Sequence, residues 1–142
     1  MQIKLVTIGK IKENIYRNRI YEYLKWINND IPIEIVFLKN DRIDKLNKKL
    51  LSHLKKQDHT ICISEEGAIH SSKNFSKLIH NQSKDITFFI GGHDGHSEFV
   101  KRETNEIMSL SLMTFPQELA LLILVEQIYR GISIFKGSKY HR

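Results

Sequence analysis

Five short apolar segments with the composition of β-strands alternate with longer segments of helical periodicity, and this alternation restricts the fold more than any other feature of the chain. Strands are expected at residues 3–8, 33–38, 60–64, 86–90 and 108–111, and helices at residues 14–27, 41–56, 71–81, 98–106 and 116–135. When a helix follows each strand, the pattern predicts an α/β fold: a mostly parallel sheet with helices on both faces. Ligands of such sheets lie at the carboxyl ends of the strands.

Several residues predict where these elements begin and end. The third strand is expected to close at Glu65-Glu66-Gly67. The third helix is expected to be capped by Ser71 or Ser72, and the fourth by Ser97. The last helix is expected to start at Pro116 and to end at Gly137.

The length of 142 residues predicts a single domain spanning residues 1–142. The one cysteine, Cys62, excludes an internal disulfide, and its apolar neighbours indicate a small buried side chain. The N-terminus lacks the pattern of a signal peptide, and the longest strongly apolar run, residues 119–125, is too short to span a bilayer. A cytoplasmic location without a membrane partner is therefore expected.

A net charge of +6 favours an anionic partner such as RNA. The basic residues are distributed along the chain, however, and the lysines between residues 41 and 56 are interpreted first as a solvated helix face. No zinc-ligand spacing of cysteine and histidine occurs, and the Walker A, GxSxG and HExxH motifs are absent from the sequence, so no metal is expected.

Two loops that follow predicted strands are the candidate ligand site. The segment 91–95, GGHDG, contains three glycines, which suit either close contact of backbone with a ligand or simply a tight turn. It is not a dinucleotide fingerprint, because the order of glycines differs. In the second loop, Thr114 precedes Phe115-Pro116, and Pro116 restricts Phe115 to extended backbone. Such a loop can present backbone groups to an adenine, although Phe115 can equally fill the core.

The last helix and the tail add two features. Glu126 and Arg130 are four residues apart and are expected to form an ion pair within the helix. The apolar side of this helix, residues 119–128, is broader than one sheet face requires, which indicates a dimer interface. The chain ends in an aromatic, a titratable and a cationic residue, whereas most termini are disordered.

Together these motifs resemble the RlmH-type ribosomal RNA large-subunit methyltransferases of the SPOUT class. The matching segments are Ile8-Gly9-Lys10, Glu22-Tyr23, Phe89-Ile90-Gly91-Gly92, Gly95, Ser109-Leu110-Ser111, Met113-Thr114-Phe115-Pro116, Glu126-Gln127-Ile128-Tyr129-Arg130 and Tyr140-His141. The resemblance covers nearly the whole chain, and the motifs occur in the same order.

The resemblance implies a homodimer with a C-terminal trefoil knot that binds S-adenosyl-L-methionine and methylates N3 of a pseudouridine in large-subunit (23S) ribosomal RNA of the assembled ribosome. Carried over by position, the cofactor contacts are Ile63, Gly91, Leu110, Ser111, Leu112, Met113, Thr114 and Phe115, and the residues near the target base are Tyr140, His141 and Arg142.

This sequence departs from the family at two positions. Gln117 and Leu121 stand where the family usually has histidine and arginine. Since the N3 proton must be lost during transfer, these replacements keep a rival hypothesis open: an RNA- or ribosome-binding protein of the same fold with weakened catalysis. A second rival is a small nucleotide-binding regulator without an RNA partner.

Overall fold

The computed structural model describes residues 1–91 and 96–142, and the side chains of His96 and Ser97 also lie outside the described part. The elements are, in chain order, β1 (Ile3–Ile8), α1 (Asn14–Ile27), β2 (Ile33–Leu38), α2 (Ile43–His53), β3 (His59–Ile69), α3 (Ser72–His80), β4 (Ile86–Ile90), α4 (His96–Glu103), β5 (Glu106–Ser109) and α5 (Gln117–Lys136). The strict alternation of strand and helix is the one that the sequence predicts.

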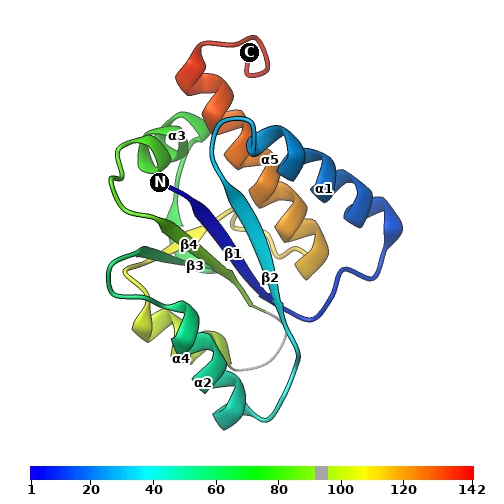
Figure 1. Cartoon of the computed structure of the whole chain (residues 1–142), viewed down its shortest axis with the longest axis vertical. Helices are drawn as coiled ribbons and strands as arrows, with labels where there is room; N and C mark the ends of the chain where they lie inside the picture. The colour runs from blue at the N-terminus through cyan, green and yellow to red at the C-terminus, as the bar shows by residue number, and fades with distance from the viewer. Residues whose placement is uncertain (92–95) are drawn as a thin grey trace.

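The strands form one five-stranded sheet in the order β2-β1-β4-β3-β5, and every neighbouring pair is parallel (Figure 1). This confirms the expected α/β fold. Because all the strands run in one direction, the loops that follow them gather at a single edge of the sheet. The trefoil knot implied by the family resemblance stays a prediction.

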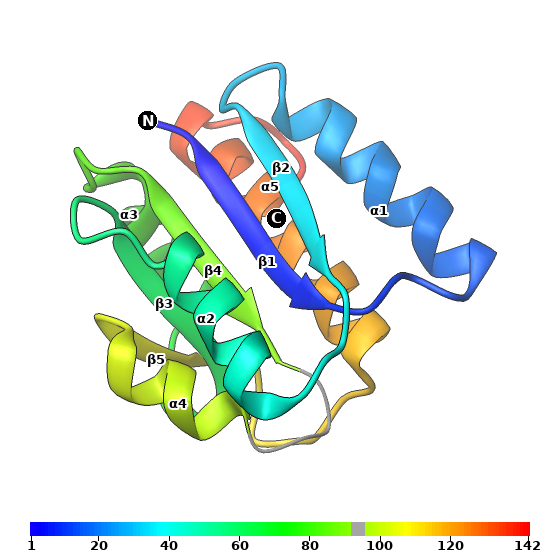
Figure 2. The same cartoon turned by 60° about the horizontal axis from the view of Figure 1, so that its bottom comes forward.

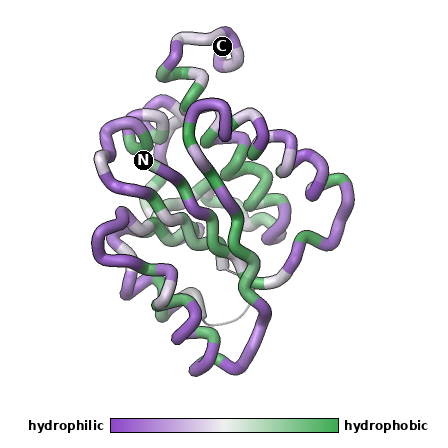
Figure 3. The backbone as a smooth tube through the Cα atoms, in the orientation of Figure 1, coloured by the Kyte–Doolittle hydropathy of each residue, from purple (hydrophilic) through white to green (hydrophobic). Residues whose placement is uncertain are grey.

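Helices cover both faces of the sheet, as predicted (Figure 2). α1, α3 and α5 pack on one face, where side chains such as Ile61, Phe88 and Leu124 form the larger core. α2 and α4 pack on the other face around a smaller core that contains Cys62 and Phe89. Hydrophobic residues follow the strands and α5 through the interior, whereas the outward sides of the other helices are hydrophilic (Figure 3). Alternate residues of each strand thus serve opposite cores, as expected of a sheet covered on both faces.

Cys62 is 1% exposed, and its burial raises the pKa of the thiol to about 11. The prediction of a small buried side chain is confirmed. In the described part of the chain, none of the helices is long and apolar enough to cross a membrane.

The third strand is longer than predicted, because it does not stop at Glu65-Glu66-Gly67. β3 continues to Ile69, and its register against β5 shifts so that Ile63 and Ala68 both pair with Met108. A Cβ atom on Gly67 would lie 2.5 Å from the carbonyl carbon of Ile107, so only glycine allows this close passage of two backbones. The acidic pair and the glycine that suggested a turn are instead a bulge within the strand.

The ends of the helices follow the predicted caps in part. The Ser71 side chain accepts a hydrogen bond from the Asn74 backbone N–H at 3.1 Å, and Gly137 ends α5 in the left-handed region at φ = 72°. α2 is shorter than expected, and β5 begins at Glu106, two residues earlier than predicted. α4 begins at His96, one residue before the serine expected to cap it, and the side chain of that serine lies outside the described residues.

Candidate functional site

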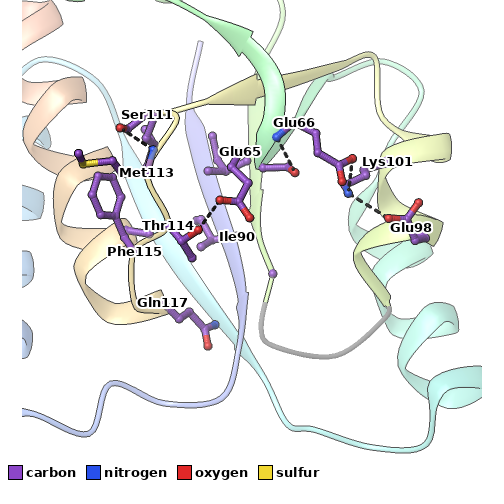
Figure 4. Close-up of a pocket in the computed structure, with 15 residues that line it drawn as sticks. Glu65, Glu66, Ile90, Glu98, Lys101, Ser111, Met113, Thr114, Phe115 and Gln117 are labelled. Carbon is purple, nitrogen blue, oxygen red and sulfur yellow. Dashed lines mark hydrogen bonds and ion pairs between the residues drawn. The ribbon is translucent and has the colours of Figure 1, made fainter.

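A pocket of about 400 Å³ opens at the carboxyl edge of the sheet, between the ends of β3, β4 and β5 and the first turn of α5 (Figure 4). Its lining residues are Ile63, Ser64, Glu65, Glu66, Ile90, Gly91, Glu98, Lys101, Leu110, Ser111, Met113, Thr114, Phe115, Gln117 and Ala120. The volume is within the range typical of sites for small molecules and cofactors.

Seven of the eight residues predicted to contact a cofactor line this pocket: Ile63, Gly91, Leu110, Ser111, Met113, Thr114 and Phe115. The eighth, Leu112, is 78% exposed and does not line it. Segments that are distant in the chain thus meet at one place because they lie in or directly after neighbouring parallel strands. Residues 92–95 of the predicted glycine loop lie outside the described residues.

The loop between β5 and α5 is held in shape by its own serine side chains. The Ser109 hydroxyl donates to the Ser111 carbonyl at 2.7 Å and accepts from the Ser111 backbone N–H at 3.2 Å. The Ser111 hydroxyl accepts from the Met113 backbone N–H at 3.0 Å. These contacts occupy two of the backbone amides that the sequence suggested for ligand binding, and they fix the conformation of the loop. Phe115 lies against the pocket rather than in either hydrophobic core.

Thr114 connects this loop to β3 across the pocket. Its hydroxyl donates a 2.5 Å hydrogen bond to the Glu65 carboxylate (Figure 4). Glu65 belongs to the bulge that Gly67 makes possible. The bulge in β3 therefore places a polar contact at the pocket wall, and the sequence did not reveal this contact.

A half-buried lysine forms the opposite wall of the pocket. Lys101 on α4 is 11% exposed at its side chain, and its Nζ atom donates to Glu66 and Glu98, each at 3.0 Å. The hydrogen bond to Glu66 is the main cause that raises the pKa of Lys101. The sequence did not predict these charged residues, since Glu66 and Lys101 are 35 positions apart and only the fold brings them together.

Gln117 and Leu121, the two departures from the family pattern, both have structural roles in this chain. The Gln117 amide donates to the Thr7 hydroxyl at 2.7 Å and to the Ile8 carbonyl at 2.9 Å, which ties the start of α5 to the end of β1. Leu121 is 2% exposed and belongs to the larger core. Gln117 also lines the pocket, so it contacts both the scaffold and the site.

The tail packs back onto α5 and α1 instead of extending from the end of the chain. Tyr140 shares a 3.0 Å hydrogen bond with the Tyr23 hydroxyl and donates to Glu126 at 3.1 Å, and Arg130 contacts His141 at 3.1 Å. Partial burial, followed by the contact with Tyr23, raises the pKa of Tyr140 well above its usual range, so the phenol stays protonated. The predicted ion pair between Glu126 and Arg130 is confirmed, with a distance of 2.6 Å.

The tail and the pocket lie at opposite ends of α5 (Figure 1). Gln117 and Ala120 at the start of α5 line the pocket, whereas the tail follows Gly137. The tail folds back along α5, however, so that Tyr140 contacts Glu126 and His141 contacts Arg130, six and ten residues after Ala120. Among the described residues, those that line the pocket do not include Tyr140, His141 or Arg142.

Comparisons with known proteins identify the family to which a chain with this sheet and this pocket belongs. A family model described as predicted SPOUT methyltransferase matches residues 1–141. The chain belongs to this family of methyltransferases.

The curated relatives agree with this assignment. The chain is 36% identical over 159 residues to the ribosomal RNA large subunit methyltransferase H of Streptococcus thermophilus, with both chains covered completely. It is 40% identical over 152 residues to the protein of the same name from Dictyoglomus thermophilum, covering 99% of each chain. A third protein of that name, from Coprothermobacter proteolyticus, is 36% identical over 146 residues and is also covered completely.

Proposed function

We propose that this chain transfers a methyl group from S-adenosyl-L-methionine to N3 of a pseudouridine in large-subunit ribosomal RNA, within the assembled ribosome in the cytoplasm. The observation that carries the proposal is the pocket at the carboxyl edge of the sheet, which gathers seven of the eight expected cofactor-binding residues. Relatives that align over their full length are named as methyltransferases of this RNA.

The chemistry of the pocket suits this cofactor. Among the described residues, three carboxylates and one ammonium group line the pocket, so the charge of this part of its wall is net negative in a chain whose net charge is +6. The sulfonium, ammonium and carboxylate groups of S-adenosyl-L-methionine leave a net positive charge, which the wall complements. Leu110, Phe115 and Ile90 offer apolar surface for the adenine.

When bound, the cofactor supplies an electrophilic methyl group on sulfur. Formation of the new bond at N3 requires the pyrimidine to lose the proton on that nitrogen. The side chains of the tail suit the binding and deprotonation of the base, because Arg142 can hold a phosphate, Tyr140 can stack on a base and His141 can exchange a proton near neutral pH. Each of these roles is a proposal about the tail.

A second chain is part of the proposal for the tail. Tyr140, His141 and Arg142 are not among the described residues that line the pocket of their own chain, so we assign them to the pocket of a partner. Leu119, Leu122 and Ile123 of α5 are half-buried in the single chain, and Leu112 and Met113 beside the pocket are 78% and 73% exposed. Apolar surface of this extent supports a homodimer built on α5.

The test is transfer of a radiolabelled methyl group to ribosomes from a strain that lacks the modification, followed by mapping of the labelled nucleotide. Label at N3 of a pseudouridine in the large-subunit RNA is expected. Cofactor binding without transfer, combined with binding to ribosomes, would instead favour the non-catalytic RNA-binding protein. The departures at Gln117 and Leu121 motivate that alternative, although both residues have structural contacts here.

The homodimer has its own measurement. One chain has a mass of 16.7 kDa, and light scattering at micromolar concentration should give twice that mass. The mass of a monomer would exclude a site that is shared between two chains.

A further inference from the structure

The positive charge of the chain is concentrated on one helix and its flanks, although the basic residues looked evenly distributed in the sequence. Residues 39–56 contain seven lysines and arginines and two aspartates, a net charge of +5, whereas the whole chain has a net charge of +6. α2 occupies the centre of this segment. The rest of the chain is thus close to neutral, and we name residues 39–56 the basic segment.

Most of the basic side chains in this segment are exposed. Lys39, Arg42, Lys45 and Lys48 are exposed, as are Lys55 and Lys56 beyond the end of the helix. Two ion pairs occur within the segment, Arg42 with Asp44 at 3.7 Å and Lys49 with Asp41 at 3.4 Å. Among the residues that the structure describes, no ion pair forms at the other five basic side chains.

The basic segment lies beside the pocket. It begins directly after β2, so its first residues are at the carboxyl edge of the sheet, where the pocket also opens. α2 packs next to α4 on the same face of the sheet (Figure 2). Glu98 and Lys101 of α4 line the pocket. A macromolecule that reaches into the pocket from this side would therefore pass along α2.

We propose that the basic segment binds the phosphate backbone of the ribosomal RNA next to the nucleotide that is methylated, an inference that rests on the proposed function. Lys45 and Lys48 are three residues apart and so lie on neighbouring turns of one helix face. Exposed lysines and arginines neutralise the phosphates of a nucleic acid, and the release of its counterions drives this binding. Such contacts fix the position of the RNA without reading its sequence.

The test compares two triple variants with the wild-type chain. Lys39→Gln, Lys45→Gln and Lys48→Gln together remove three exposed charges from the basic segment, and Lys25→Gln, Lys73→Gln and Lys77→Gln remove three exposed charges from α1 and α3 on the other face. The KM for ribosomes and its dependence on salt are measured in methyl transfer. Affinity for S-adenosyl-L-methionine, measured by calorimetry, and thermal unfolding show that each variant is folded and retains its cofactor site.

We expect the first variant to raise the KM for ribosomes at least tenfold at low salt, with little change in cofactor affinity. The slope of log affinity against log salt should fall by about 0.7 to 0.9 for each phosphate contact that is lost. The control variant should stay close to the wild type. Equal KM values and equal salt slopes for the two triple variants would overturn the assignment of the basic segment and leave the proposed function intact.

Two further outcomes separate this inference from its alternatives. If the wild type transfers no methyl group to ribosomes, the proposed function fails, and a salt titration of ribosome binding still tests the basic segment. α2 also exposes Ile43 (57%) and Leu51 (47%), which a ribosomal protein would contact. If Ile43→Ser with Leu51→Ser raises the KM, and the lysine variant does not, the partner is a protein surface and the proposal of phosphate contacts is wrong.

Discussion

The bulge in β3 makes a sharp prediction, because Gly67 is the residue that allows it. In Gly67→Ala, the new Cβ atom would lie 2.5 Å from the carbonyl carbon of Ile107, 2.6 Å from its oxygen and 2.6 Å from the Met108 nitrogen. All three atoms belong to the backbone of β5, so no side chain can rotate away. The two strands must therefore separate.

We expect Gly67→Ala to lower the free energy of unfolding by about 3 kcal/mol, the upper part of the usual range for added atoms in a packed interior. In urea this corresponds to a fall of the midpoint by roughly 1 to 2 M. The variant should also bind S-adenosyl-L-methionine more weakly, since β5 leads directly into the loop at residues 110–115 and Glu65 of the bulge bonds Thr114.

Gly131→Ala is the matched control within the same chain. Its Cβ atom would lie 3.4 Å from the Ser76 Cα atom and 3.6 Å from a terminal carbon of Ile79, which are ordinary contacts. Gly131 is inside α5, where alanine is favoured over glycine by about 1 kcal/mol. Gly131→Ala should therefore unfold at equal or higher urea. If Gly67→Ala were as stable as this control and bound the cofactor as tightly as the wild type, the reasoning about the bulge would be refuted.

The remaining predictions concern the pocket, the buried thiol and the tail. Gly91→Val places a branched side chain against the cofactor, so calorimetry should show weaker binding while the fold remains; unchanged affinity would contradict the placement of Gly91. Thr114→Val removes the hydrogen bond to Glu65 and should weaken cofactor binding about fivefold, the equivalent of ~1 kcal/mol, whereas Thr114→Ser keeps the hydroxyl and should bind normally. Cys62, with its pKa raised to about 11, should resist iodoacetamide at pH 8 in the folded protein and react in urea. Because the pKa of the thiol is higher in the folded than in the unfolded protein, the stability that it contributes is present below about pH 9. This stability is lost as the pH rises towards 11. Deletion of residues 140–142 should abolish methyl transfer and leave cofactor binding nearly intact, and transfer at the wild-type rate would remove the tail from the mechanism.

The sequence predicts the elements whose boundaries are set by neighbouring residues. β1, β2, β4 and α1 match to the residue, because a glycine, asparagine or proline marks one boundary of each segment locally: Gly9, Asn28 and Gly91 follow β1, α1 and β4, and Pro32 precedes β2. β3 does not match, since Glu65-Glu66-Gly67 has the composition of a turn while its conformation depends on pairing with β5, which is distant in the chain. Local composition predicts an element well when no distant strand competes for its backbone.

The same distinction applies to the candidate site. The loop at residues 110–115 is visible in the sequence because Pro116 and the serines act locally. The pair of Lys101 with Glu66, and the contact of Tyr140 with Tyr23, join residues 35 and 117 positions apart. Spacing within a motif carries no information about such pairs, since they depend on which elements of the fold pack together.

The division of charge within the chain connects the pocket to the surface beside it. The described residues of the pocket wall carry three carboxylates and one ammonium group, whereas the basic segment has a net charge of +5. A methyl transferase for RNA must bind a cationic cofactor and a polyanion at adjacent places, and one uniform charge would repel one of the two. Lys101 shows how the separation is maintained: Glu66 and Glu98 surround its charge at the wall, so this lysine is neutralised where the cofactor would bind. The exposed lysines of α2 on the same face of the sheet have no such carboxylate pair among the described residues, and their charge remains directed at solvent, where an RNA backbone would approach.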